Sequence, residues 1–319
     1  MRKLSAIAAV LLVGMCLVCS CQQKPEKLRL LYWNIQNGMW DGQTDNYDRF
    51  VEFVKSKNPD ICVWCEAQTI YLTGTAQGMP EKDRYLCDNW PQLAARYGHE
   101  YVYVSAHPDN YPQVVTSKYP IENVLRMDGR DSDTIVAHGA SWSRIQVLDK
   151  TLNLVTLHTW PHAYSYQAED REASASEGGG DIFRSKEMAY ICRHTIETSK
   201  NAQDELWMMM GDFNSRSRMD NAFYRYPEND TRLLVHDYIL EHTPYVDVIA
   251  REHPGEFIPT TAGASRIDFV YASPALYEKV RKAEVLRDYY LEPVKAEGIS
   301  NFYYPSDHRP IMVDFDLGK

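Results

Sequence analysis

Polar and acidic side chains stand at the ends of several short apolar segments of the chain. The residues in this position are Asn34, Glu66, His158, Asp212 and Asn214, while Asp268 lies inside a further apolar segment and Asp307 and His308 directly precede the last one. A single acid after a strand is most often a turn or capping residue. Because the arrangement recurs along the chain, we interpret these residues as parts of one site.

The residue types in this set favour the hydrolysis of phosphate esters. Its acids, which are Glu66, Asp212, Asp268 and Asp307, would repel one another in a partly buried site, and a hard divalent cation would relieve that repulsion. Oxygen ligands without thiolates favour Mg²⁺, Mn²⁺ or Ca²⁺ over Zn²⁺. His158 and His308 add groups that can donate to a phosphate oxygen. A metal with acids and imidazoles is a hydrolytic constellation for phosphate esters.

Strands must carry these residues, and helices interrupt the strands at intervals. Segments rich in apolar, β-branched and aromatic residues predict strands at Leu28–Trp33, Ile61–Cys65, Tyr101–Val104, Val114–Ser117, Ile135–Val147, Leu152–Leu157, Leu206–Met210, Ile267–Tyr271 and Ile311–Phe315. Helical spacing predicts helices from Asp45 or Asn46 to about Lys57, over Asn89–Tyr97 and over Phe183–Ser199. The clustered strands favour an α/β (α+β) fold of two packed mixed sheets flanked by helices.

The stretch Ser165–Asp181 combines polar and small residues with Gly178, Gly179 and Gly180. This composition predicts one long mobile loop, either functional or a surface insertion.

Two residues after the predicted strand that ends near Leu157 are candidates for substrate contacts. His162 lies four residues after His158, the spacing of a helical metal pair, but Pro161 argues against a helix there. We interpret His162 as a supporting or substrate-loop residue or as plain surface. Trp160 could line a substrate pocket, or it could be a packing aromatic.

Three arginines could also reach a substrate. Arg184 begins the helix after the glycine loop and is either a phosphate contact or part of a solvated helix face. Arg216 and Arg218 follow the Asp212 segment, and surface charge is the better interpretation for Arg218.

The cysteines Cys62 and Cys65 form a C-x-x-C pattern, which invites a redox or zinc interpretation. Residues three apart on a strand point to opposite faces of the sheet, so the two thiols should not meet. We expect two small buried residues instead.

The first residues have the pattern of a secretory signal. Arg2 and Lys3 precede an apolar run that is too short to span a bilayer. Cys21 follows small residues in a segment that resembles a bacterial lipobox. We expect a signal peptide over 1–20, a lipidated Cys21 with a polar tether over 21–27, and one catalytic domain over 28–319. The protein would be exported and lipid-anchored to a bacterial envelope membrane; an ordinary cleaved signal without lipid is the alternative.

The charge of the chain argues against some functions. The 319 residues carry a formal net charge of −10, from 34 basic and 44 acidic residues. Cleavage before Cys21 would remove Arg2 and Lys3, which leaves the mature chain at −12. A protein that depends on non-specific attraction to nucleic-acid phosphates usually has a basic excess. We therefore expect no obligate nucleic-acid partner, and no protein partner is evident.

The order of these segments resembles the endonuclease/exonuclease/phosphatase superfamily. The resemblance rests on Trp33-Asn34, Glu66, His158, Gly211-Asp212-Phe213-Asn214, Arg266-Ile267-Asp268-Phe269 and Ser306-Asp307-His308. It covers nearly the whole mature chain. The resemblance implies a four-layer α/β sandwich with the site at one open edge of the paired sheets.

The resemblance also implies roles for single residues. Glu66 would be the principal metal ligand beside Asn34, and Asp307 would support the metal region. Asp212 would orient and deprotonate the attacking water, and Asn214 would fix Asp212 or the phosphate. Asp268 would pair with His308, which would bind a non-bridging phosphate oxygen. His158 would bind another oxygen or help to protonate the leaving group.

His158 bears on the choice among branches of the superfamily. With histidine at this position, the chain resembles the deoxyribonuclease, sphingomyelinase and inositol-phosphatase branches, whereas abasic-site nucleases tend to carry tyrosine there. Within these we favour small or lipid-like phosphoesters as substrates. A secreted nuclease of the deoxyribonuclease type and a non-catalytic binding lipoprotein on the same fold are the alternatives, and a purely structural envelope protein would not need such a set of acids and histidines.

Overall fold

The structure is a computed structural model of the chain. It describes residues 27–36, 38, 47–67, 86–107, 111–129, 135–295, 297 and 303–318. The predicted signal peptide, the predicted lipidation site Cys21 and the predicted helix-capping residues Asp45 and Asn46 lie outside these ranges.

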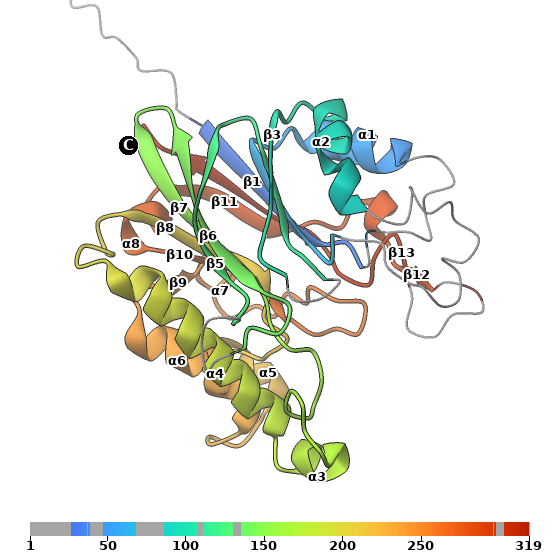
Figure 1. Cartoon of the computed structure of the whole chain (residues 1–319), viewed down its shortest axis with the longest axis vertical. Helices are drawn as coiled ribbons and strands as arrows, with labels where there is room; N and C mark the ends of the chain where they lie inside the picture. Colours follow the sequence, from blue (N-terminus) through green and yellow to red (C-terminus); the bar gives the residue numbers. More distant parts are fainter. Residues whose placement is uncertain are drawn as a thin grey trace, which may run out of the picture.

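Two six-stranded mixed sheets face each other (Figure 1). The first sheet has the order β11-β14-β1-β2-β4-β3 and consists of β11 (Val280–Val285), β14 (Ile311–Asp316), β1 (Lys27–Asn34), β2 (Ile61–Cys65), β4 (Val114–Ser117) and β3 (Tyr101–Val104). The second has the order β5-β6-β7-β8-β10-β9 and consists of β5 (Ile121–Met127), β6 (Ala140–Val147), β7 (Lys150–His158), β8 (Leu206–Asp212), β10 (Asp268–Ala272) and β9 (Val246–Asp247). A separate hairpin pairs β12 (Val294–Lys295) with β13 (Tyr303–Tyr304).

Helices cover the outer faces of both sheets (Figure 1). The α-helices are α1 (Asp48–Lys57), α2 (Leu86–Arg96), α3 (Arg171–Ser176), α4 (Gly179–His194), α5 (Asn221–Tyr224), α6 (Leu234–His242), α7 (Val248–Glu252) and α8 (Pro274–Tyr277), and the short 3₁₀ turns are Ile196–Thr198, Arg218–Asp220, Thr231–Leu233 and Tyr289–Leu291. Apolar residues of α1 and α2 pack on the first sheet, and those of α4 and α6 pack on the second. A third apolar cluster fills the space between the sheets. The fold is therefore the predicted four-layer sandwich.

One strand pair in each sheet is parallel, and these two pairs determine where the site forms. β1 runs parallel to β2, with Asn34 opposite Cys65, and β7 runs parallel to β8, with His158 opposite Asp212. The other strand pairs of both sheets are antiparallel. Because parallel strands point in the same direction, the polar residues at their C-terminal ends gather at one end of each sheet.

The prediction of one mobile loop over Ser165–Asp181 is wrong. Residues 171–176 form α3, capped by the Asp170 carboxylate, and α4 already begins at Gly179. The predicted helix Phe183–Ser199 is correspondingly shifted, because α4 ends at His194 and a separate 3₁₀ turn follows. The predicted strand Ile135–Val147 begins only at Ala140, since a turn with Gly139 at φ 80° precedes it.

The interpretation of Cys62 and Cys65 as buried, unbridged residues is confirmed. Both thiols are free, and they pack in different apolar clusters on the two faces of the first sheet. In the part of the chain that the structure describes, no helix has both the length and the apolar character that crossing a bilayer requires.

Candidate active site

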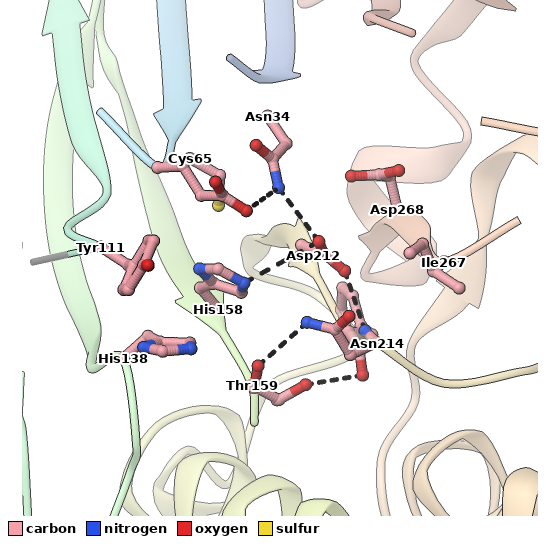
Figure 2. Close-up of polar contacts among 12 residues, drawn as sticks. Asn34, Cys65, Tyr111, His138, His158, Thr159, Asp212, Asn214, Ile267 and Asp268 are labelled. Carbon is pink, nitrogen blue, oxygen red and sulfur yellow. Dashed lines mark hydrogen bonds and ion pairs between the residues drawn. The ribbon is translucent and has the colours of Figure 1, made fainter. Parts of the chain in front are cut away.

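Asp212 lies at the centre of the predicted site because three strands of the second sheet meet there. His158, the last residue of β7, is its parallel neighbour, and Asp268, the first residue of β10, is its antiparallel neighbour. Asp212 is buried, with 2% of the residue's surface exposed. Figure 2 shows His158 and Asn34 directed towards Asp212.

Asn34 connects the first sheet to this centre. Its Nδ2 donates to Glu66 Oε1 at 3.1 Å and, as Figure 2 shows, to Asp212 Oδ2 at 3.0 Å. Its Oδ1 accepts from the backbone N–H of Gln36 at 3.0 Å. In this arrangement Asn34 holds the two carboxylates in place through its amide nitrogen, while its oxygen faces the backbone.

His308 is fixed by a chain of buried hydrogen bonds. Its Nδ1 lies 2.8 Å from Asp268 Oδ2, and the Tyr32 hydroxyl donates to Asp268 Oδ1 at 2.7 Å. The Ser306 hydroxyl accepts from the His308 backbone N–H at 3.0 Å and donates to the Asn34 carbonyl at 2.7 Å. The imidazole therefore keeps Nε2 free of the Asp268 contact, and Nε2 lies 3.8 Å from Asp212 Oδ2.

The two remaining predicted residues, Asp307 and Asn214, also reach the cluster. Asp307 Oδ1 lies 3.8 Å from His308 Nε2. Asn214 holds Asp212 with its backbone N–H, which donates to Asp212 Oδ1 at 2.9 Å. Its side-chain amide instead donates to the Thr159 carbonyl at 3.0 Å. The structure thus brings together Asn34, Glu66, His158, Asp212, Asn214, Asp268, Asp307 and His308.

The protonation states in the cluster follow from burial and from neighbouring charges. Burial, then the charge of Asp268, raises the pKa of Asp212 to about 7. Burial alone would lower the pKa of His308, but the Asp268, Asp307 and Asp212 carboxylates outweigh it and raise this pKa well above its ordinary value. Burial and two neighbouring imidazoles lower the pKa of His158 well below its ordinary value. These shifts favour the imidazolium form of His308 and the neutral form of His158.

Glu66, which directly follows β2, and Asn214, two residues after the end of β8, have left-handed backbone conformations. Their φ angles are 52° and 46°. Such a conformation costs a residue with a Cβ about 1–2 kcal/mol, although asparagine tolerates it better than glutamate. Strain of this kind persists where the surroundings require it, and at functional sites in particular.

The donor set fits a hard divalent cation. Single ligand atoms of Glu66, His158 and Asp212 lie within 4.8 Å of one another, as do those of Asp212, Asp268 and His308. Burial is the main cause that raises the pKa values of Glu66 and Asp307, and for Glu66 the charge of Asp307 is the second cause. Concentrated carboxylates without thiolates are the chemistry that Mg²⁺, Mn²⁺ or Ca²⁺ would satisfy.

A buried glutamate outside this cluster holds two of the loops that form the site. Glu187 of α4 accepts the Ala137 backbone N–H at 2.8 Å on Oε1 and the Trp160 backbone N–H at 3.0 Å on Oε2. Its side chain is fully buried, and burial raises its pKa to about 7. His138 directly follows the first anchor, Ala137, and His158 lies two positions before the second anchor, Trp160.

Arg184 continues this contact between α4 and the loop after β7. Its Nη1 donates to the carbonyls of Trp160 at 2.8 Å and of His162 at 2.9 Å, and its Nη2 pairs with Asp181. Only 5% of Arg184 is exposed, so the interpretation as a solvated helix face is wrong. Its guanidinium is engaged with the loop backbone, which makes Arg184 a residue that positions the loop.

The glycines of the predicted loop have a packing role at the start of α4. The Gly180 N–H donates to the Ala163 carbonyl at 2.8 Å. A Cβ on Gly180 would lie 2.1 Å from the His162 carbonyl oxygen. The helix can therefore press directly against the backbone of residues 162–163 only because this position lacks a side chain.

Aromatic rings extend from His158 along this loop. The His138 ring lies 4.4 Å from His158 and 6.1 Å from Trp160, between centroids (Figure 2 shows the two histidines). The Trp160 ring lies 4.6 Å from His162, which stacks on Tyr164 at 4.9 Å. We call the side chains of His138, Trp160, His162 and Tyr164 the aromatic rim. Trp160 and His162 therefore lie beside the cluster, and their contact with substrate stays a prediction.

The other two arginines lie on the loop after Asp212. Arg216 is half-buried, and its Nη2 donates to the Ser265 hydroxyl at 3.3 Å. Its contact with substrate stays a prediction. Arg218 is exposed and forms an ion pair with Asp237 at 2.7 Å, which confirms its interpretation as surface charge.

Sequence reasoning missed three residues of this site. Tyr32 could have been found, because it lies two positions before Asn34 on one strand and so shares its face. His138 precedes its strand in a turn, and a lone histidine there gives no signal. Glu187 looks like an ordinary charged helix residue, and nothing in the sequence indicates which backbone groups it binds.

Comparison with known proteins agrees with this geometry. The sequence model of the Endonuclease/Exonuclease/phosphatase family matches residues 31–308. No curated protein sequence is similar enough to count as a relative. Among solved structures, an AP endonuclease from Archaeoglobus fulgidus is 18% identical with a TM-score of 0.57. The match covers 91% of this chain and 100% of that one.

Two further solved structures have the same fold. An endonuclease/exonuclease/phosphatase protein from Beutenbergia cavernae DSM 12333 is 18% identical with a TM-score of 0.59, covering 92% of this chain and 72% of that one. The human Nocturnin catalytic domain with bound sulfate is 13% identical with a TM-score of 0.58, covering 91% and 93%. At these identities the likeness shows the fold alone. The family match spans most of the chain, and the chain therefore belongs to the endonuclease/exonuclease/phosphatase family of hydrolases.

Proposed function

We propose that the protein is a divalent-metal-dependent hydrolase of phosphoesters that acts through a water activated by Asp212. The observation that carries this proposal is the contact set of Asp212. Its Oδ2 lies 3.8 Å from His308 Nε2 and 3.9 Å from His158 Nε2, and it accepts a hydrogen bond from Asn34, which also binds Glu66. A base, a cation and a neutral donor thus surround one small volume.

The residues of the chain divide the chemistry among them. Asp212, held by the Asn214 N–H, accepts the proton of the attacking water. The His308 imidazolium, held by Asp268, donates from Nε2 to a non-bridging phosphate oxygen. The neutral His158 donates a hydrogen bond to a second phosphate oxygen or to the leaving oxygen, which takes up a proton as its bond to phosphorus breaks. Glu66 and Asp307 would hold Mg²⁺, Mn²⁺ or Ca²⁺, which would supply positive charge to offset the charge that develops on the phosphate.

Small phosphoesters are the proposed substrates. The mature chain would carry a net charge of −12, which disfavours a long polyanion such as DNA unless the metal site attracts it locally. A secreted nuclease of the deoxyribonuclease type is the alternative within the same chemistry.

The test of the proposed function compares two site variants with a surface variant. Asp212→Asn and His308→Ala should each lower the hydrolysis of bis(p-nitrophenyl) phosphate or p-nitrophenyl phosphate in Mg²⁺ at least about a hundredfold, because each removes a preorganised group from the transition state. Arg218→Met is the control for an exposed ion pair and should retain full activity. Wild-type turnover in both site variants would refute the proposal.

A substrate panel separates the branches. Plasmid DNA, sphingomyelin, inositol phosphates and nucleotide esters should be compared at equal Mg²⁺ concentration. We expect the highest kcat/KM on a small soluble ester. Plasmid DNA as the best substrate would favour the nuclease. A chain that hydrolyses none of these and binds no Mg²⁺ or Mn²⁺ by calorimetry would be a binding lipoprotein.

A further inference from the structure

The start of β1 and the active site lie at opposite ends of the sandwich. β1 runs from Lys27 to Asn34, and Asn34 is the residue that binds Glu66 and Asp212. A strand rises about 3.3 Å per residue, so Lys27 lies about 23 Å from Asn34. The chain therefore enters the domain at the end remote from the site.

The second sheet has the same polarity. β7 runs from Lys150 to His158, and β8 runs from Leu206 to Asp212. At the entry end Lys27 pairs with Asp316 of the last strand. Figure 1 shows the start of β1 and α3 at opposite ends of the molecule. The aromatic rim and α3 therefore extend the domain further away from Lys27.

The predicted tether is too short to reverse this arrangement. Five residues lie between Cys21 and Lys27, so the two are six Cα-to-Cα steps apart, and at most about 3.6 Å per step gives a reach of about 22 Å. To place the site on the membrane, a lipid on Cys21 would have to pass along the whole flank of the domain, beyond Asn34 and beyond the rim. The path exceeds the reach of the tether.

We propose that a lipid on Cys21 holds the domain with its active site facing away from the anchoring membrane. The substrate is then a water-soluble phosphoester that arrives from the aqueous compartment, and it is not the headgroup of a lipid in that same membrane. This inference rests on the proposed function for the class of substrate and on the lipidation of Cys21 for the orientation.

The net charge supports the same orientation. A mature chain at −12 is repelled by an anionic lipid surface, so electrostatic attraction does not draw the domain down onto the membrane. The tether remains the only link that this inference requires.

The first experiment measures orientation independently of activity. The full lipidated chain, with lipid on Cys21 verified by mass spectrometry, is reconstituted in vesicles of phosphatidylethanolamine and phosphatidylglycerol that contain an acceptor-labelled lipid. A donor dye is placed by Lys282→Cys near the entry end or by Glu172→Cys on α3. Both positions are exposed. Lys282 lies near the entry end, because it is opposite Asp314 in the strand pairing and the Asp314 carboxylate accepts a hydrogen bond from Arg29, two residues after Lys27. The native thiols of Cys62, Cys65 and Cys192 are buried, and Cys87, whose side chain lies outside the described part of the structure, is replaced by serine in both labelled chains.

The two dyes should report different distances from the lipid surface. We expect strong energy transfer from the Lys282→Cys dye and at least about threefold weaker transfer from the Glu172→Cys dye. An insertion of twenty Gly/Ser residues between Gln23 and Lys24 should reduce this difference. Equal transfer from the two dyes with the native tether, or a mature chain without lipid on Cys21, would overturn the inference.

The second experiment measures access to the site. The vesicle-bound chain and the unanchored Cys21→Ser chain should hydrolyse soluble bis(p-nitrophenyl) phosphate at rates within about twofold of each other. A tenfold lower rate for the anchored chain, or release of phosphorylated headgroup from its own vesicle, would overturn the inference. If neither chain hydrolyses any ester, the proposed function fails, while the energy-transfer result still decides the orientation.

Discussion

Asp212 and His308 approach each other at 3.8 Å between Oδ2 and Nε2, and their pKa values are both raised, for opposite reasons. Burial and the charge of Asp268 make Asp212 a weaker acid, with a pKa of about 7, while the same Asp268 keeps His308 protonated. Asp268 therefore supports both proposed roles, because a base near neutrality and a charged donor are what the hydrolysis requires.

Replacing Asp268 by asparagine should change both groups at once. In Asp268→Asn the pKa of His308 falls, since the partner that raises it most is gone, and the imidazole is neutral at a lower pH than in the wild type. We expect kcat at pH 7.5 to fall at least tenfold, with part of the loss recovered at acidic pH. NMR titration of the His308 ring protons measures the cause directly.

Asp237→Asn is the matched control, because Asp237 pairs with Arg218 at the surface. It should leave the pH profile and the His308 titration unchanged. An unaltered His308 titration in Asp268→Asn would show that this pair does not set the charge of the imidazole.

The polar ends of the strands could be predicted from the sequence because local rules govern them. A polar residue that ends an apolar strand, or directly follows one, lies at the end of the sheet, and this places Asn34, Glu66, His158 and Asp212. The fold class followed from the same strands. The predicted pairing of Asp268 with His308 is confirmed at 2.8 Å, although that prediction came from resemblance to a family.

The loop after β7 could not be predicted, because its structure depends on tertiary contacts. Three consecutive glycines usually indicate a flexible segment, yet here Gly180 allows α4 to contact the loop backbone. Arg184 and Glu187 resemble ordinary charged helix residues in the sequence. Only the fold shows that they bind backbone groups of residues 137, 160 and 162.

Glu187→Gln should impair catalysis while the fold persists. A glutamine offers one acceptor oxygen and one NH₂ group to two backbone N–H donors, so either Ala137 or Trp160 loses its partner. An unsatisfied buried donor costs about 1–3 kcal/mol. Since these anchors position His138 and His158, we expect kcat to fall about tenfold, with a smaller change in KM. Steady-state kinetics and the His158 NMR signals check this expectation.

Glu197→Gln provides the comparison for that variant. Glu197 lies in the 3₁₀ turn after α4, and its Oε1 accepts a hydrogen bond from the exposed Tyr238 hydroxyl at 2.9 Å. Its kinetics should equal those of the wild type. If Glu187→Gln lowers the melting temperature but leaves kcat and the His158 signals intact, Glu187 has a structural role only.

Gly180→Ala should displace the aromatic rim. The new methyl group would lie 2.1 Å from the His162 carbonyl oxygen, a backbone atom, so the loop or the helix must move. We expect a loss of stability of about 1–3 kcal/mol, as for other overpacked sites, together with a raised KM. Gly263→Ala is the control, because its Cβ would meet its nearest neighbour at 3.8 Å. Equal denaturation midpoints and KM values for the two variants would contradict the close approach.

Arg266→Met should destabilise the fold strongly. Arg266 lies two residues before Asp268 in the chain. Its guanidinium is buried and binds Asp247 at 3.0 and 2.8 Å and Asp220 at 2.7 Å. Removing the arginine leaves two buried carboxylates without their cation, which costs about 3–5 kcal/mol. Arg218→Met, in an exposed pair, should cost less than about 1 kcal/mol. Urea denaturation of both variants distinguishes these values. Equal denaturation midpoints would refute the stabilising role of Arg266 between the two buried carboxylates.

His236 should make the fold sensitive to acid. Burial, then the charge of Arg266, lowers its pKa well below the ordinary 6.5, so the folded state holds it neutral. Its contribution to stability is therefore present above pH 6.5 and is lost as the pH falls towards the depressed value, at up to about 1.4 kcal/mol per pH unit. Glu187 acts in the opposite direction, since its raised pKa of about 7 favours the fold in acid.

The contribution of His236 is isolated by comparison with His236→Phe. The phenylalanine keeps the ring packing against Phe213 and Phe269 but cannot be protonated. It loses the hydrogen bond to the Tyr271 hydroxyl at 2.8 Å, so this variant should be less stable than the wild type at pH 8. The difference in unfolding free energy should shrink as the pH falls from 7 to 5. A difference that stays constant over this range would show that His236 does not titrate on unfolding.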